Sequence, residues 1–155
     1  MNQCTVRPNT LRGCTNFKLR QLMRRVAQHY DAELGQAGLK TTQYSLLTHV
    51  LKLGPLRPSD LAQAIKMDSS TLTRNLKPLI EAGWVTLSAG ADGRSRSVAI
   101  TDTGKAKQQQ ARQYWKKAQQ SLNQKLGHER VLALHTLIDD SLDLLSTSPS
   151  DTFST

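Results

Sequence analysis

The sequence predicts a mainly α-helical fold with one small β-hairpin. Apolar residues recur at helical spacing through most of the chain, whereas only residues 84–88 and 96–100 have the composition of strands. A glycine-rich stretch, 89–95, separates these two runs and favours a turn between antiparallel strands. The chain has 155 residues, which is enough for one domain with its own hydrophobic core.

The charge composition indicates a basic protein. The formal net charge is +9, which suits a nucleic acid or an anionic membrane surface as partner. Cations are concentrated in residues 7–40 and 101–130. The C-terminal stretch is acidic, through Asp139, Asp140, Asp143 and Asp151. No apolar run approaches a membrane span and the N-terminus lacks the apolar core of a signal peptide, so we expect a cytoplasmic protein without a membrane partner.

The sequence contains no motif typical of catalysis, metal binding or a cofactor. Paired carboxylates, a nucleophile beside a base, and a phosphate-binding loop are all missing. The two cysteines, Cys4 and Cys14, lack metal-ligand spacing, and a structural disulfide is not expected in a cytosolic chain. We therefore expect no enzyme activity, no metal and no cofactor.

The first helices are delimited by breaks in the apolar pattern. Residues 1–14 read as a flexible arm, and a helix follows over 15–34. Thr41 or Thr42 can cap the next helix, which ends before the Gly54–Pro55 pair.

Two short helices in tandem predict a helix-turn-helix. The first begins with Pro58 and ends near Lys66, and Asp68 then caps a second helix that continues to Gly83. Ala62 is small enough to let the two helices cross closely. Pro78 lies inside the second helix and should kink it.

The second of these helices has a polar face suited to DNA. Ser70, Thr73, Arg74 and Lys77 form one stripe, opposite a leucine face. Hydroxyls and cations can bond phosphates and base edges in a major groove. Taken alone, the stripe fits an ordinary solvated surface equally well.

The expected hairpin directly follows this helix and has a cationic tip. Arg94 and Arg96 share a face if the chain is extended, and Asp92 can hold one arginine in position. A guanidinium on a protruding tip suits the minor groove. We interpret the hairpin as a wing, the alternative being a plain surface turn.

The remaining helices predict a dimerisation platform. Apolar stripes run along the first helix and along the helices expected over 102–126 and 128–145. The winged helix-turn-helix over 41–101 can bury its own core, so these stripes have little left to cover within one chain. We therefore assign 15–40 and 102–146 to dimerisation, and 147–155 to a disordered tail.

The wing and its flanks resemble the MarR family of bacterial transcription regulators. Asp92-Gly93-Arg94-Ser95-Arg96-Ser97-Val98-Ala99-Ile100-Thr101-Asp102-Thr103-Gly104 is similar to the family's wing pattern, D-x-R-S-x-x-(V)-x-(L)-T-x-x-G. Leu61-Ala62, Thr71-Leu72-Thr73-Arg74 and Glu81-Ala82-Gly83-Trp84-Val85 resemble its helix-turn-helix segment. The resemblance covers about residues 15–146.

The resemblance implies a homodimeric, cytoplasmic repressor that binds a palindromic operator and is then associated with the nucleoid. It places Ser69, Ser70, Thr71, Thr73 and Arg74 in the major groove, with Arg94 in the minor groove and Asp92 orienting it. Lys77 and Arg96 complete the expected DNA contacts from the stripe and the tip. Arg57 departs from the family, which often has a capping Ser or Thr there, but it could touch a phosphate.

The resemblance also implies release of DNA by a small aromatic acid or phenol. Its crevice would lie between the dimerisation helices and the winged unit. An aromatic anion needs an apolar slot, a cation and a hydrogen-bond donor. The candidates in this chain are Arg20, Arg24, His29, Tyr44 and His49. The alternative for Tyr44 and the histidines is simple packing between helices.

Two other hypotheses stay open. One is a repressor of the same family that senses peroxide through Cys14, although the family's reactive cysteine would fall at Asn16. The other is a protein that coats DNA without sequence preference.

Overall fold

The computed structural model describes residues 13–146, and it confirms a mainly α-helical fold with a two-stranded antiparallel hairpin. The predicted tail, 147–155, and all but the end of the predicted arm, 1–14, lie outside the described residues. The elements are α1 (Thr15–Leu34), a 3₁₀ turn η1 (Gly35–Ala37), α2 (Thr41–Leu53), α3 (Pro58–Ala64), α4 (Ser69–Glu81), β1 (Val85–Ala89), β2 (Arg96–Ile100), α5 (Asp102–Leu126) and α6 (His128–Ser146).

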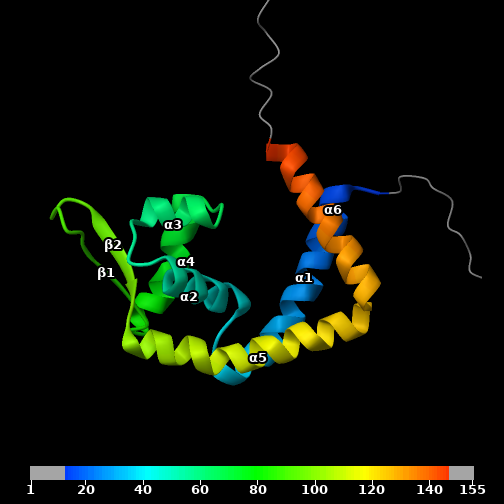
Figure 1. Cartoon of the computed structure of the whole chain (residues 1–155), viewed down its shortest axis with the longest axis horizontal. Coiled ribbons are helices and arrows are strands. Elements are labelled where there is room, and N and C mark those ends of the chain that lie inside the picture. The colour runs from blue at the N-terminus through cyan, green and yellow to red at the C-terminus, as the bar shows by residue number, and fades with distance from the viewer. Residues whose placement is uncertain (1–12, 147–155) are drawn as a thin grey trace, which may run out of the picture.

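The chain forms two parts joined by one long helix (Figure 1). Helices α2–α4 and the hairpin gather at one end of α5; we call residues 41–100 the winged unit. Helix α6 rises from the other end of α5, and α1 rises beside it from the second half of α5 (Figure 1). None of the helices in the described part of the chain is long and apolar enough to cross a membrane.

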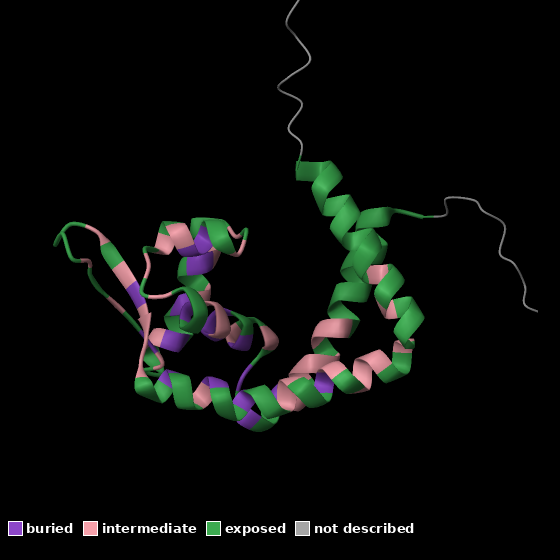
Figure 2. Cartoon of the chain, viewed as in Figure 1, coloured by how far each residue is buried: buried purple, intermediate pink, exposed green. Residues whose placement is uncertain are grey.

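The hydrophobic core lies in the winged unit (Figure 2). Its fully buried side chains come from α2, α3, α4 and both strands, with Leu34 added from the end of α1. Helix α6 has no buried residue. The winged unit therefore buries a hydrophobic core largely from its own side chains, whereas α1 and α6 leave apolar side chains exposed.

The start of α2 corrects one expected cap. The capping position is Lys40, and Thr41 is the first helical residue. Thr41 instead donates its backbone N–H and its hydroxyl to one carboxylate oxygen of Asp31 on α1, at 2.7 and 2.6 Å. Asp31 thereby satisfies an orphan donor of α2 and ties the winged unit to α1.

The link between α3 and α4 is as tight as expected. Lys66 adopts a left-handed backbone conformation, with φ of 51°, and Met67 donates its N–H to the carbonyl of Ala62 at 2.9 Å. Helix α3 ends at Ala64, two residues earlier than predicted. Helix α4 continues through Pro78 to Glu81, and Gly83 follows with φ of 73°.

The hairpin is fixed to the body along β2 and at its base. Val85 pairs with Ile100 and Ala89 pairs with Arg96, and Leu56 exchanges two backbone hydrogen bonds with Val98 at 3.1 and 2.8 Å. Thr101 caps α5, since its hydroxyl oxygen accepts the N–H of Gly104 at 3.0 Å. The same hydroxyl donates to the carbonyl of Gly83 at 2.7 Å, which holds the base of the wing against the end of α4.

Candidate nucleic-acid interface and effector cavity

Asp68 organises the first turn of α4. Its carboxylate accepts hydrogen bonds from the hydroxyl of Ser70 at 2.6 Å, and from the hydroxyl and N–H of Thr71 at 2.7 and 2.9 Å. These bonds, with that of Ser70 the strongest cause, hold the pKa of Asp68 well below its usual range. Thr71 is half-buried by this arrangement, so it shapes the turn more than it faces solvent.

The predicted polar stripe of α4 faces solvent. Its members Ser70, Thr73, Arg74 and Lys77 are all exposed, and so is Ser69, which the family resemblance adds to the expected contacts. Together with Leu87 and Arg96 of the hairpin, most of them line a surface hollow of about 650 Å³ between α4 and the wing. Glu81, which the stripe did not include, lies 3.8 Å from Lys77 and forms an exposed ion pair with it.

The wing tip is shaped by Asp92, but not as predicted. One Asp92 oxygen accepts the N–H of Arg94 at 3.1 Å, and the N–H and hydroxyl of Ser95 at 2.9 and 2.6 Å. These bonds, first that of the Ser95 hydroxyl, lower the pKa of Asp92 to about 2. Among the described residues Asp92 forms no ion pair with the Arg94 side chain. Arg94 lies in the bend before β2, so it does not continue the extended run of Arg96.

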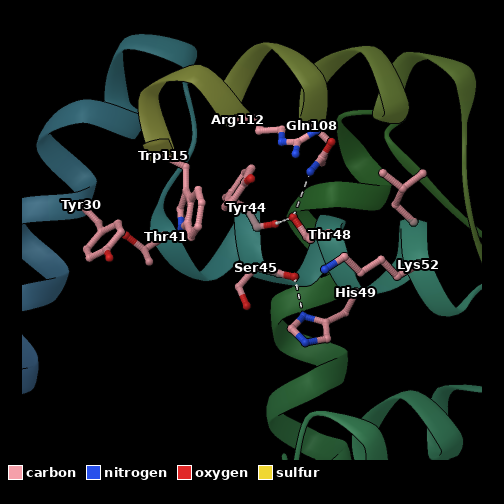
Figure 3. Close-up of a pocket in the computed structure, with 11 residues that line it drawn as sticks. Tyr30, Thr41, Tyr44, Ser45, Thr48, His49, Lys52, Gln108, Arg112 and Trp115 are labelled. Atoms are coloured by element: carbon pink, nitrogen blue, oxygen red, sulfur yellow. Dashed lines mark hydrogen bonds between the residues drawn. The ribbon is translucent and has the colours of Figure 1, made fainter. Parts of the chain in front are cut away.

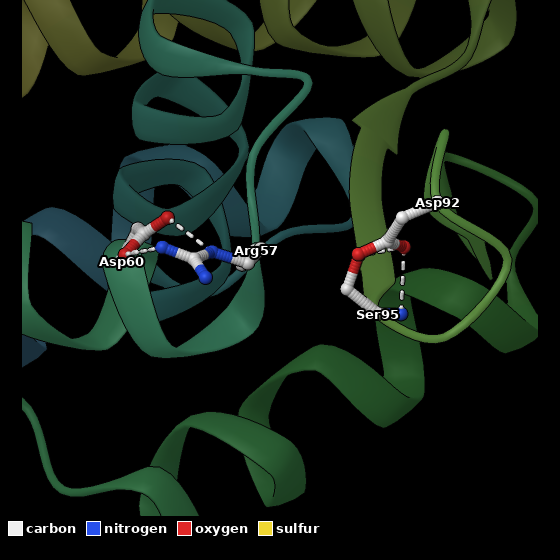
Figure 4. A network of polar contacts seen from close by, with 4 residues as sticks. All are labelled: Arg57, Asp60, Asp92 and Ser95. Atoms are coloured by element: carbon white, nitrogen blue, oxygen red, sulfur yellow. Dashed lines mark hydrogen bonds and ion pairs between the residues drawn. The ribbon is translucent and has the colours of Figure 1, made fainter.

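Arg57 stands between α3 and the wing (Figure 4). Arg57 occupies the capping position of α3 but makes no capping hydrogen bond, because a guanidinium cannot accept one from a backbone N–H. Its guanidinium forks onto Asp60, with Nε at 3.0 Å from one oxygen and Nη2 at 3.4 Å from the other. Asp60, and more weakly Asp92, raise the pKa of Arg57. The sequence interpretation missed Asp60 as the partner of this cation.

Replacing Asp68 with asparagine should separate the effect of the capping hydrogen bond on stability from the effect of the carboxylate charge. Asparagine keeps an acceptor for Thr71, so the melting temperature near neutral pH should stay close to that of the parent. The pKa of Asp68 is lower in the folded protein than in the unfolded chain, where it is about 4. The ionised carboxylate therefore stabilises the fold above about pH 4, and this stabilisation is lost as the pH falls further. From about pH 5 to about pH 2 the parent should lose more melting temperature than D68N. Asp68→Ala is the control, and should melt lower even at neutral pH. Parallel pH profiles of parent and D68N would contradict this role of Asp68.

A second candidate site is a cavity of about 600 Å³ between α1, α2 and α5 (Figure 3). We call it the interhelical cavity. Tyr44 and Trp115 both line it and stack against each other, with ring centroids 6.1 Å apart and planes 25° from parallel. The remaining lining side chains are Tyr30, Thr41, Ser45, Thr48, His49, Leu51, Lys52, Gln108 and Arg112.

Polar groups at the interhelical cavity are fixed by neighbours. Gln108, which is only 8% exposed, donates its amide to the Thr48 hydroxyl at 3.2 Å, and Thr48 donates to the carbonyl of Tyr44 at 2.9 Å. His49 Nδ1 lies 2.7 Å from the carbonyl of Ser45. Because a carbonyl oxygen only accepts, Nδ1 carries the hydrogen, and this bond sets the orientation of the ring.

The structure brings together only part of the predicted ligand set. Tyr44 and His49 line the interhelical cavity, but three other candidates do not. His29 donates from Nε2 to the carbonyl of Ala118 at 3.0 Å, which fastens α1 to α5. Arg20 is exposed and bonds Asn16, and Arg24 lines a separate hollow on the α1 surface.

The cations at the interhelical cavity are Lys52 and Arg112, which the sequence interpretation missed. Gln108, Arg112 and Trp115 follow each other at helical spacing on α5, and that spacing was the available signal. Residue spacing shows that these three side chains share one face of α5. It does not show that this face packs over α2, because that depends on how the helices pack.

Cys14 is exposed and lies at the capping position of α1, where its side chain makes no capping hydrogen bond. Cys4 lies outside the described residues. Over residues 13–146, no three histidine, cysteine or acidic side chains are grouped so as to hold a metal ion.

Comparison with known proteins identifies a group of DNA-associated regulators. A model of the MarR family matches residues 37–95. The transcriptional regulator YwoH of Bacillus subtilis is 29% identical over 90 residues, which are 58% of this chain and 66% of YwoH. The chain thus matches slightly less than two thirds of the length of this curated relative.

Solved structures extend the similarity over most of the chain. The regulator MosR of Mycobacterium tuberculosis, in complex with DNA, is 30% identical with a TM-score of 0.72, over 86% of this chain and 99% of that chain. Bordetella bronchiseptica BpsR, solved in a study of its regulation by 6-hydroxynicotinic acid, has a TM-score of 0.76 at 18% identity, over 88% and 99% of the chains. BpsR supports the fold alone.

Proposed function

This chain belongs to the MarR family of transcriptional regulators, and we propose that it is a homodimeric repressor that binds a palindromic operator and is released by a small aromatic acid or phenol. Its relatives in the family are regulators rather than enzymes. The observation that carries the proposal is the exposed hydroxyl and cation stripe of α4, placed beside a cationic wing. Its test is whether the protein enriches an inverted repeat from random DNA.

The homodimer is supported by a groove with no partner inside the described chain. Helices α1, α5 and α6 enclose an apolar groove of about 630 Å³. We call it the apolar groove. Among the side chains that line it, Leu19 is 55% exposed, Met23 is 65% exposed and Ile138 is 41% exposed. Contiguous exposure on this scale is typical of an interface. A two-fold dimer presents two α4 helices and therefore fits a palindromic site.

The DNA contacts follow from the arrangement of α4 and the wing. Thr73 and Arg74 face outward from α4, where a major groove admits a helix and its base edges can be read. Arg94, on the exposed bend, would enter the adjacent minor groove. The cations available for phosphates around this surface are Arg57, Lys77 and Arg96. Asp68 fixes the backbone of the first turn of α4, and Asp92 fixes the backbone of the wing tip.

The effector site is the interhelical cavity. The stacked Tyr44 and Trp115 rings offer an apolar aromatic wall, and Arg112 offers a forked cation for a carboxylate. The side chains of Lys52 and His49 complete the polar rim. BpsR, which shares the fold, is regulated by 6-hydroxynicotinic acid, an aromatic acid.

Replacing Arg112 with glutamine should remove the response to aromatic acids. A ligand that binds only the folded protein raises its melting temperature by mass action. Benzoate-type acids that raise the melting temperature of the parent should have little effect on R112Q, because the carboxylate loses its cation. Arg24→Gln is the matched control, since it removes an arginine from α1 outside the cavity. Equal shifts in the parent and R112Q would assign the ligand to another site.

Release of DNA would follow from residues that the two hollows share. Tyr30 and Thr41 line both the interhelical cavity and the apolar groove. Thr41 is also held by Asp31 of α1. A ligand that displaces these side chains would therefore change the position of the winged unit relative to α1, and with it the separation of the two α4 helices.

The thiol hypothesis rests on the exposure of Cys14 and stays a prediction. A protein that coats DNA without sequence preference is the other alternative, and the selection of DNA sites distinguishes it from the leading proposal.

A further inference from the structure

We propose that the effector of this protein is an aromatic acid with two negative charges, one bound by Arg112 and the other by Lys52. The inference rests on the proposed function, because it takes the interhelical cavity as the effector site. It goes further by naming the class of ligand that this site prefers. That class is an aromatic ring that carries one carboxylate and a second anionic group.

The two cations reach the interhelical cavity from different helices (Figure 3). Arg112 belongs to α5, whereas Lys52 lies in the last turn of α2. Both side chains are exposed, and neither forms an ion pair with another residue of 13–146. The cavity therefore presents two positive charges that have no ionic partner in the described part of the chain.

The rest of the cavity lining supplies no negative charge to balance these cations. None of its eleven residues is an aspartate or a glutamate. Asp31 is not one of the lining residues, and its carboxylate is engaged by Thr41. A ligand with one carboxylate can neutralise only one of the two cations, whereas a dianion can neutralise both. Charge complementarity therefore favours the dianion.

The neutral polar groups of the α2 wall are already engaged. The single hydroxyl hydrogen of Thr48 is donated to the carbonyl of Tyr44 at 2.9 Å. The Nδ1 hydrogen of His49 is donated to the carbonyl of Ser45 at 2.7 Å, and Nε2 of the neutral ring can only accept. Of Thr48, His49 and Lys52, only Lys52 keeps donors for a second anionic group.

The interhelical cavity has space for a ring with two acidic groups. Its volume of about 600 Å³ lies within the range of small-molecule sites, about 300–1,000 Å³. Tyr44 and Trp115 supply the apolar surface for the ring. The cavity thus combines an aromatic wall with one cation on α5 and one on α2.

Matched ligands separate the effect of charge from the effect of shape. Isophthalate and 3-carbamoylbenzoate have nearly the same shape, but the amide removes one charge, and terephthalate and 4-carbamoylbenzoate form a second such pair. By isothermal titration calorimetry, at least one dicarboxylate should bind the parent about fivefold or more tightly than its amide partner. Added salt should reduce this preference, because both cations are exposed.

Replacing Lys52 with glutamine identifies the group that binds the second charge. K52Q should lose the preference for the dicarboxylate, while its affinity for the amide partner stays close to that of the parent. Lys116→Gln is the matched control, since it removes an exposed cation of α5 that does not line the cavity, and it should keep the preference. A cation in the last turn of α2 also stabilises that helix, so circular dichroism verifies the fold of K52Q at the titration temperature.

Two results would overturn the doubly charged ligand while leaving the interhelical cavity as the effector site. One is equal affinity of the parent for each dicarboxylate and its amide partner, and the other is a K52Q protein that keeps the preference of the parent. If no acid of either charge binds the parent, the proposed effector site is wrong, and this inference fails with it.

Discussion

Replacing Gly104 with alanine is expected to destabilise the protein by about 2–3 kcal/mol, because the added methyl group has no space. A Cβ at this position would overlap the carbonyl oxygen of Trp84 and lie 2.8 Å from Cγ1 of Ile100. That carbonyl already accepts the N–H of Thr101 at 3.0 Å, so it cannot withdraw freely. Three segments meet at this point: the first turn of α5, the base of the wing and the end of α4. The added methyl group would force all three to shift.

Gly35 provides the matched control for this substitution. It has φ of −57°, and a methyl group added to its Cα would meet no neighbouring side chain or packed segment within 4 Å. Gly35→Ala should leave the midpoint of urea unfolding unchanged or slightly raised, since alanine restricts the unfolded chain. Equal midpoints for Gly104→Ala and the parent would show that the close approach of α5 to Trp84 is absent in solution.

Replacing Arg74 with alanine is expected to reduce operator affinity by about tenfold to hundredfold, with a smaller loss on random DNA. Arg74 is exposed on the outer face of α4, and its guanidinium donates a long hydrogen bond, of 3.4 Å, to the hydroxyl of Thr71. So weak a contact leaves the side chain free to reach a base edge. Fluorescence anisotropy with operator and random duplexes at matched salt concentrations measures both losses.

Lys117→Ala is the control for Arg74, because it removes an exposed cation from α5, away from α4 and the wing. It should lower the affinity for both duplexes little and equally. Equal large losses of Arg74→Ala on operator and random DNA would mean that Arg74 contacts phosphates only, and that base reading belongs to other residues of the stripe.

Local signals in the sequence are sufficient to predict the elements of the winged unit. The sequence predicts Asp68 as the cap of α4, and its carboxylate accepts the N–H of Thr71. The extent of α5 follows from the stretch beginning at Thr101 and from the break at Gly127. Caps and helix breakers act over three or four residues, so a single sequence contains the whole interaction.

Contacts between distant segments cannot be read in the same way. The sequence suggests that Asp92 orients an arginine side chain, but its carboxylate binds through one oxygen to the N–H groups of Arg94 and Ser95 in its own turn. It also suggests Arg20 and Arg24 as cations beside the effector, whereas the packing of α5 over α2 places Arg112 there. The partner of a long charged side chain depends on the packing of helices, which the residue spacing does not fix.

The most direct test of the proposed function is selection of binding sites from a pool of random duplex DNA by the purified protein. The proposal predicts enrichment of an inverted repeat whose half-sites lie about 10 base pairs apart, centre to centre, because two α4 helices must enter successive major grooves on one side of the duplex. Binding to the selected sequence should exceed binding to random DNA by about a thousandfold or more. A selected pool without a repeat, bound no more tightly than random DNA, would contradict sequence-specific regulation and leave a protein that coats DNA.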